Sequence, residues 1–390
     1  MKRPTPSAVL IAGLLAMMLL ACNRSGAPST TRTVFFRGEA VATVVEQTPG
    51  PRLITRVTRL NDNVITLTAT LDADGFALGA VSDRPGRRHI ELKAGSIFDD
   101  LGHRVAVPGR VLLLDLVHRV RATRKQTATL LDLASAESIP VTVERKGPQI
   151  VVVDVNGRVV VRADPEGLRL GPGAFAEGDA APSLPLSLVE IEVPGLRSVA
   201  GKMLGGPALA VQLPTTTTTP AHLAAGIFFE SDDPAVKALV ACTGLPLPDA
   251  VAVAEKVHKL VDAAKVDEPP SARGMLAWGG DCDGAAALVT AALRSCGHPA
   301  RAVVGFKLLA AGTAKARLVP HALAEVYSDG LWSKVDPTVP AIGPLNDTFL
   351  PIAEGLGGAL TMGRVLGVLD AADLVSLPPA VSVAVPDGPR

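Results

Sequence analysis

Aromatic residues and net charge are both scarce in this chain of 390 residues. Phe, Trp and Tyr together make up 3% of the sequence, and 38 basic residues balance 38 acidic ones. Without an excess of positive charge, the chain has no electrostatic reason to bind nucleic acid. The low aromatic content, beside abundant Ala, Gly and Val, is more typical of genomic base composition than of a structural need.

Metal-binding motifs are also missing. The sequence has four cysteines, but it contains no Cys-x-x-Cys and no His-Glu-x-x-His. It therefore predicts neither a metal site nor a cofactor. His89, His103, His118 and His222 have no partners at ligand spacing, and we interpret each of them as a solvated or packed side chain.

No long hydrophobic run follows the basic residues Lys2 and Arg3. The apolar stretch Ala8–Ala21 is short for a membrane span and has the length of a signal-peptide core. It ends in Leu-Leu-Ala-Cys, which resembles the bacterial lipobox, so Cys22 is the predicted lipidation site. Asn23 after it favours the outer membrane. We expect a lipid-anchored protein of the bacterial cell envelope that faces the periplasm; a membrane-spanning signal anchor is the alternative.

The length of the chain predicts two domains. The first part has short runs rich in Val, Ile and Thr, separated by turn pairs such as Asn156-Gly157. This pattern predicts an antiparallel β domain with a curved sheet or a sandwich. A threonine run between Pro214 and Pro220 predicts an exposed linker. The expected segments are a signal peptide (1–21), a tether (22–32), a β-rich domain (33–200), a linker (201–220), a second domain (221–376) and a tail (377–390).

Cys282 is the most informative residue of the second domain. It follows Gly280-Asp281 and precedes a run of helix-forming residues up to Arg294 that contains no proline. We therefore place Cys282 at the start of a helix, with Asp281 as the N-cap. The positive end of the helix dipole favours a thiolate, so the sequence predicts a lowered pKa for the Cys282 thiol.

A predicted hairpin brings a histidine and a carboxylate together. Asp329-Gly330 separates two strand-like runs, a strong signal for a tight turn. Counting outwards from this turn puts Leu323 opposite Asp336, so His321 is the diagonal neighbour of Asp336 on the same face. The carboxylate can then orient the imidazole, which can serve Cys282 as base and acid.

These motifs resemble the transglutaminase-like superfamily of papain-like cysteine acyl transferases and peptidases. The resemblance rests on the segments 280–284, 297–306, 321–327 and 332–338 in that order. It implies an α+β, papain-like domain in which Cys282 is the nucleophile, His321 the base and Asp336 the third member. Leu323 is a departure, because the family usually has an aromatic residue there, and Cys296 is a second departure.

The implied reaction is acyl transfer on a protein or peptide substrate through a thioester. Water would resolve the thioester in a peptidase or amidase, and an amine would do so in a transglutaminase. We lean to hydrolysis because water is abundant and an amine needs a second site. The alternative from another class is a non-catalytic envelope lipoprotein whose β domain binds a protein or glycan.

Several side chains near these motifs have two interpretations. Glu325 shares the face of His321 and is either a contact of the site or, as we favour, a strand carboxylate that meets a neighbouring charge. Trp278 and Trp332 either wall a cleft or pack, and for Trp332 packing is favoured. Cys242 and Cys296 are either a disulfide or, as we expect from their apolar surroundings, free buried thiols.

Overall fold

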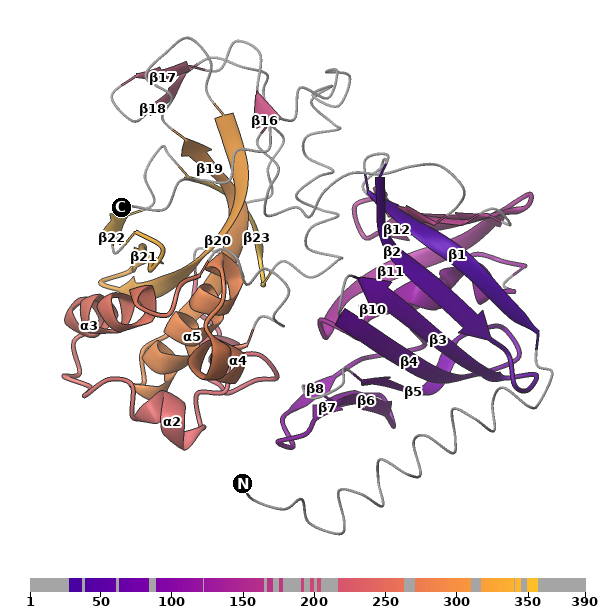
Figure 1. Ribbon diagram of the computed structural model, residues 1–390, viewed down its shortest axis with the longest axis horizontal. Helices are drawn as coiled ribbons and strands as arrows, with labels where there is room; N and C mark the ends of the chain where they lie inside the picture. Colours follow the sequence, from indigo (N-terminus) through magenta and orange to yellow (C-terminus); the bar gives the residue numbers. More distant parts are fainter. Residues whose placement is uncertain are drawn as a thin grey trace, which may run out of the picture.

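The computed structural model describes residues 28–36, 39–60, 63–83, 89–121, 123–164, 167–170, 175–177, 191–192, 197–199, 202–204, 217–262, 271–309, 317–339, 341–344 and 349–356. Figure 1 shows two parts, an N-terminal region of strands and a C-terminal region in which helices accompany a second sheet. The predicted signal peptide, Cys22 and the predicted tail lie outside the described residues. In the described ranges, no helix has both the length and the apolar character needed to cross a bilayer.

The described part of the N-terminal region forms one sheet of 15 strands. The strands are β1 (Ser29–Phe36), β2 (Glu39–Gln47), β3 (Leu53–Leu60), β4 (Asn63–Leu71), β5 (Ala77–Asp83), β6 (His89–Lys93), β7 (Ser96–Asp99), β8 (Arg104–Ala106), β9 (Val111–Leu113), β10 (Gln126–Asp132), β11 (Glu137–Lys146), β12 (Gln149–Asp154), β13 (Val159–Asp164), β14 (Gly167–Leu170) and β15 (Phe175–Glu177). Their order is β4-β3-β2-β1-β15-β14-β13-β12-β11-β10-β9-β5-β6-β7-β8.

The sheet closes on itself because β4 also pairs with β5. Neighbouring strands run antiparallel except β9 and β10, which are parallel. The antiparallel β domain predicted from the sequence is therefore confirmed, in the form of a barrel. Closure protects most strand edges from pairing with other chains.

A short 3-10 segment, η1 (Leu114–Arg119), packs against the inner face of this barrel. Its Leu114 and Val117 share a buried apolar cluster with Ile150 and Val152 of β12. The turn before β5 fixes the end of η1, since the Arg121 N–H donates to the Asp74 carbonyl at 2.8 Å. On one side, the interior of the barrel is therefore occupied by η1.

The C-terminal region combines helices with a second sheet. Its helices are η3 (Pro220–His222), α2 (Pro234–Lys237), α3 (Pro246–His258), α4 (Ala272–Trp278) and α5 (Cys282–Ser295). Its strands are β19 (Ala300–Leu309), β20 (Arg317–Ser328), β21 (Leu331–Asp336), β22 (Ala341–Pro344) and β23 (Phe349–Glu354), in the order β22-β21-β20-β19-β23. A separate pair consists of β17 (Arg197–Val199) and β18 (Lys202–Leu204).

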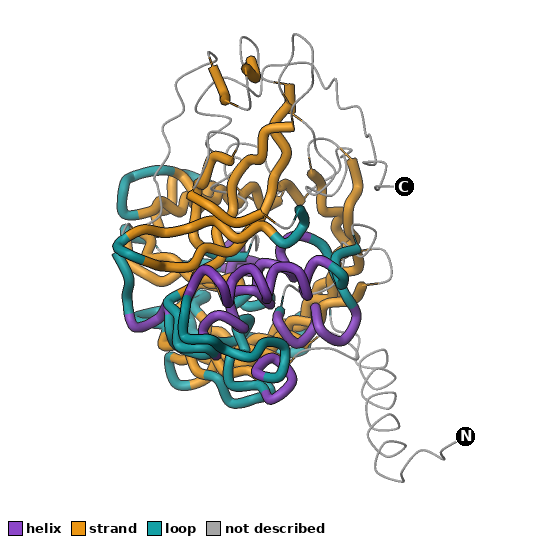
Figure 2. The backbone as a smooth tube through the Cα atoms, turned by 90° about the vertical axis from the view of Figure 1, so that its left-hand side faces the viewer, coloured by secondary structure: helices purple, strands orange, loops and turns teal. Residues whose placement is uncertain are grey.

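Helix α5 is the central helix of this region. Its residues from Gly284 to Leu293 are all buried, and many of them are alanines, which let the helix approach β19 and β20 closely. Figure 2 shows the helices gathered against these strands. The predicted α+β architecture is confirmed.

Two segment boundaries differ from those expected. Strand β1 begins at Ser29, so residues 29–32 are strand where a tether was expected. Strand β16 (Ile191–Glu192) pairs with β20 and so joins the second sheet, although the β-rich domain was expected to reach residue 200. Both boundaries depend on which strands pair with one another. Local composition does not indicate this pairing.

Cys242 and Cys296 form a disulfide, with their Cα atoms 5.4 Å apart. The expectation of two free buried thiols was wrong. Cys296 is the C-cap of α5, and the packing of α3 against α5 brings the loop that carries Cys242 to this helix end. Apolar surroundings indicated burial but could not indicate this proximity.

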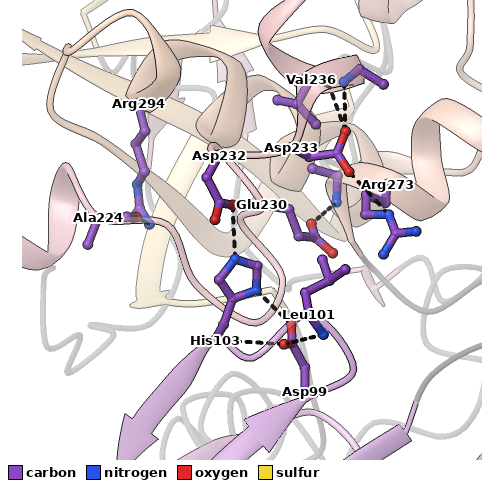
Figure 3. Close-up of polar contacts among 12 residues, drawn as sticks. Asp99, Leu101, His103, Ala224, Glu230, Asp232, Asp233, Val236, Arg273 and Arg294 are labelled. Carbon is purple, nitrogen blue, oxygen red and sulfur yellow. Dashed lines mark hydrogen bonds and ion pairs between the residues drawn. The ribbon is translucent and has the colours of Figure 1, made fainter.

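The two regions meet through polar and apolar contacts. His103 follows β7 and contacts Asp99 in its own region at 2.8 Å and Asp232 in the other at 2.9 Å (Figure 3). Arg273 at the start of α4 lies 3.9 Å from Asp100. One buried apolar cluster contains barrel residues together with Phe228 and other side chains of the C-terminal region. The regions therefore share part of a core.

Candidate active site

The start of α5 places Cys282 as the sequence predicts. Cys282 is the first helical residue and Asp281 is the N-cap. The Asp281 side chain makes no capping hydrogen bond; instead it is hydrogen-bonded to Asp283, which also accepts from the Gly284 N–H at 2.8 Å. The first turn of α5 is therefore closed by a pair of carboxyl groups on either side of the cysteine.

This carboxyl pair changes the electrostatics of the helix start. Burial and the neighbouring Asp281 raise the pKa of Asp283 well above its ordinary value. The two carboxyl groups therefore favour the protonated form of Asp283.

Cys282 is half-buried and has no disulfide partner. Burial, followed by the charges of Asp281 and Asp283, raises the pKa of its thiol well above the ordinary value. The lowered pKa expected from the helix dipole was wrong, because desolvation and the adjacent carboxyl groups outweigh the dipole. In the opposite direction, the backbone N–H of Ala322 donates to the sulfur.

His321 and Asp336 meet across the predicted hairpin. Ser328 pairs with Leu331, and Ala324 pairs with Val335, which is the register expected from the turn. His321 Nε2 lies 3.1 Å from Asp336 Oδ2, and both side chains are buried. The ring therefore presents Nδ1 as the nitrogen that remains for another partner.

Asp336 has further partners that hold its carboxylate in place. Lys307 Nζ donates to Oδ2 at 2.9 Å, and the Thr338 hydroxyl donates to Oδ1 at 2.6 Å. Burial alone would raise the pKa of Asp336, but the hydrogen bond and charge of His321, with those of Lys307, hold it far below the ordinary value. Asp336 is therefore a carboxylate at any moderate pH.

Lys307 was missed by sequence reasoning. It lies on β19, opposite Val319 of β20, and its partner Asp336 lies on β21 on the other side of β20. The strand pattern could have indicated Lys307 in part, because Lys307 is two residues beyond Gly305, which pairs with His321. Alternation along β19 places Lys307 on the same face as the histidine pair.

Gly305 of β19 allows β23 to approach closely, and this approach brings Phe349 against the His321 ring. A Cβ atom at this position would lie 1.9 Å from the Leu350 carbonyl oxygen of β23. The register of β19 and β23 shifts between Val304 and Gly305, and this bulge brings β23 close. Phe349 of β23 then meets the His321 ring edge-on, with ring centroids 6.2 Å apart.

Glu325 and Trp332 have structural partners. Glu325 is fully buried and accepts a hydrogen bond from Arg301 Nε at 2.7 Å, so it meets a neighbouring charge as favoured. The guanidinium of Arg301 also lies over the Trp332 ring, 4.1 Å from its centroid. Trp332 therefore packs within the sheet. Trp278, at the end of α4, is 46% exposed.

Comparison with known proteins agrees with this geometry. Residues 239–337 match the Transglutaminase-like superfamily. These residues form a transglutaminase-like domain. The matched range of the transglutaminase-like domain includes Cys282, His321 and Asp336. The match supports a cysteine-based catalytic role at the level of the superfamily.

One solved structure is similar to the chain. It is a protein from Cytophaga hutchinsonii described as a candidate cysteine protease, with 21% sequence identity and a TM-score of 0.27. The similarity covers 35% of this chain and 50% of the other, so this chain spans half the length of that protein. No curated protein matches the chain.

Proposed function

We propose that this protein catalyses acyl transfer from amide or peptide substrates through a thioester on Cys282. One observation carries the proposal. Strand β20 holds both the His321 ring, 3.1 Å from Asp336, and the Ala322 N–H that donates to the Cys282 sulfur. These contacts support the assignment of Cys282 as nucleophile, His321 as base and Asp336 as orienting carboxylate.

The proposed reaction has two halves. In the first, Nδ1 of His321 takes the thiol proton as Cys282 Sγ attacks the substrate carbonyl carbon, and the proton passes to the departing amine as the carbon–nitrogen bond breaks. In the second, His321 takes a proton from water, whose oxygen attacks the thioester. The carboxylic acid leaves, and the cysteine recovers its proton.

Asp336 supports the imidazole in both halves. Its carboxylate fixes the tautomer with hydrogen on Nε2 and stabilises the imidazolium that forms in each half. Because the Cys282 thiol has a raised pKa, the resting site holds a neutral thiol. Proton transfer then accompanies attack, without a thiolate formed beforehand.

We favour water as the second substrate, because water is abundant and an amine needs a dedicated site. The test uses an activated acyl ester and mass spectrometry of the intact protein. The parent should gain the mass of the acyl group and then lose it to water. Cys282→Ala and His321→Ala should gain none. Product formed mainly with an added primary amine would assign a transglutaminase, and acylation of Cys282→Ala would remove the proposed nucleophile.

We also propose that the protein is anchored in the cell envelope by a lipid on Cys22. The supporting feature is the lipobox-like sequence after a short apolar run. Labelled fatty acid should enter the parent protein in cells and be absent from Cys22→Ser. Cys282→Ser, the matched control, should keep the label. Equal labelling of both variants would exclude Cys22.

A further inference from the structure

The N-terminal barrel contains a cavity of about 360 Å³ beside η1. This volume lies within the range of small-molecule sites. The lining residues come from β1, η1, β13 and the hairpin of β11 and β12, and they are Thr30, Arg32, His118, Arg119, Arg145, Pro148, Ile150 and Ala163. The cavity belongs to the barrel and is separate from the site at Cys282.

Three guanidinium groups reach the cavity from three different elements. Arg32 comes from β1, Arg119 from the end of η1 and Arg145 from β11. Arg145 donates to the Val120 carbonyl oxygen at 2.8 Å, and Arg119 donates to Thr48 Oγ1 at 3.2 Å. These bonds fix the two groups in place while they line the cavity.

Two carboxylates, Glu46 and Asp115, lie beside these arginines. Glu46 is buried and is shared by Arg56, His118 and Arg119. Asp115 is the second carboxylate, 3.4 Å from Arg56.

Arg119 is under strain from its like-charged neighbours. Burial, together with repulsion from Arg32 and Arg121, lowers the pKa of Arg119. Its Nε atom is buried and has no hydrogen-bond partner in the described part of the chain. Cations that converge in a poorly solvated place are unfavourable without a compensating anion.

We propose that this cavity binds a phosphate group. A phosphate monoester carries close to two negative charges at neutral pH, and three arginines from separate elements line the cavity. Its oxygens suit guanidinium groups, which can form two parallel hydrogen bonds to one phosphate. Thr30, whose hydroxyl is a further possible donor, also lines the cavity.

The remaining wall suits an organic part of the ligand. Pro148, Ile150 and Ala163 provide apolar surface next to the arginines. The phosphate could be free inorganic phosphate or the head group of a lipid, since both offer the same oxygens to the arginines. The apolar wall gives a lipid additional contact but is not required for phosphate itself.

The test is isothermal titration calorimetry on the full chain. The probes are inorganic phosphate and dihexanoyl phosphatidic acid, with dihexanoyl phosphatidylcholine as the zwitterionic comparison. Saturable binding of inorganic phosphate assigns free phosphate as sufficient. Saturable binding of phosphatidic acid alone assigns a lipid head group. Absence of saturable binding for both anionic probes, or equal binding of phosphatidylcholine, overturns the proposal.

Two variants locate the binding. Arg32→Gln and Arg145→Gln each remove a guanidinium that lines the cavity and should weaken binding about ten- to hundred-fold, the usual worth of a hydrogen bond to a charged group. Arg124→Gln is the matched control, because Arg124 is exposed and does not line the cavity. If Arg124→Gln weakens binding as much as the other two, the anion sits on the general surface and the cavity is excluded.

If Arg32→Gln fails to fold, the binding affinity of Arg145→Gln tests the proposal. The Arg145 side chain is exposed at the edge of the cavity, so the substitution removes little packing. Circular dichroism and the melting temperature without ligand confirm that each variant is folded. A folded Arg145→Gln variant with unchanged affinity overturns the proposal.

Discussion

Lys307 and Asp336 are joined by a hydrogen bond of 2.9 Å on the same carboxylate oxygen that contacts His321. The lysine and the histidine therefore share Oδ2. Lys307 is a positioning residue in this arrangement, because it touches the carboxylate and acts on the imidazole only through it.

Lys307→Met should lower the rate of acyl transfer about tenfold and alter its pH profile. Lys307 helps to keep the pKa of Asp336 low, so its loss lets that carboxyl group protonate at a higher pH. The activity of the variant should then fall at a higher pH on the acid side than that of the parent. Lys259→Met, at the exposed end of α3, is the control. An unchanged acid limb in Lys307→Met would exclude this positioning role.

Asp336→Asn should keep the fold and lower the rate by a factor on the order of 10² to 10⁴. The amide cannot stabilise an imidazolium or hold the same tautomer. Combining it with His321→Ala should be no worse than His321→Ala alone, since the residues act as a unit. Steady-state rates of the single and double variants give the comparison. Parental activity in Asp336→Asn would mean that another group orients the ring.

Cys282 should be alkylated slowly at neutral pH and faster as the pH rises above 8. Its raised pKa keeps the thiol protonated in the resting protein. Iodoacetamide labelling followed by mass spectrometry, over a range of pH, measures this directly. Cys242 and Cys296 should remain unlabelled until a reductant opens their disulfide. An inflection for Cys282 near pH 5 would show that a thiolate exists before substrate binds.

The His103 contact between the two regions should make stability depend on pH. Burial disfavours the charged ring, but the bonds to Asp99 and Asp232 outweigh it and raise the pKa of His103. The contribution is full below the unfolded pKa of about 6.5 and disappears as the pH rises through the raised folded pKa.

His103→Asn should therefore melt below the parent at pH 5.5 and close to it at pH 9. A difference of about 2–4 °C is the scale expected for one such contact in a chain of this size. His89→Asn is the control, because His89 is half exposed and pairs with Asp83 within its own region. A deficit that is equal at both pH values would point to lost packing instead of lost charge.

The sequence predicted the parts of the site that local rules control. The Asp329-Gly330 turn has positive φ angles of 52° and 83°, and this turn sets the register that brings His321 to Asp336. The first helical residue of α5 was also predictable, because the alanine-rich run begins there. Both results depend on short segments of the chain, the longer of which spans the 15 positions from His321 to Asp336.

The rest depends on contacts between distant segments. Lys307 reaches Asp336 across an intervening strand, and the disulfide joins residues 54 positions apart. The pKa of Cys282 was expected in the wrong direction because the helix dipole was considered without desolvation and without the neighbouring charges of Asp281 and Asp283. Such effects follow from the folded environment.

The pairing of β16 with β20 has a practical consequence for dissecting the protein. Ile191 and Glu192 cover the edge of β20 at Leu318 and Arg317. A fragment cut at residue 201, where the sequence pattern changes, would leave those backbone groups open to a strand from another molecule. A fragment that starts before residue 191 keeps the edge covered, so the transglutaminase-like domain is better isolated together with the segment that precedes it.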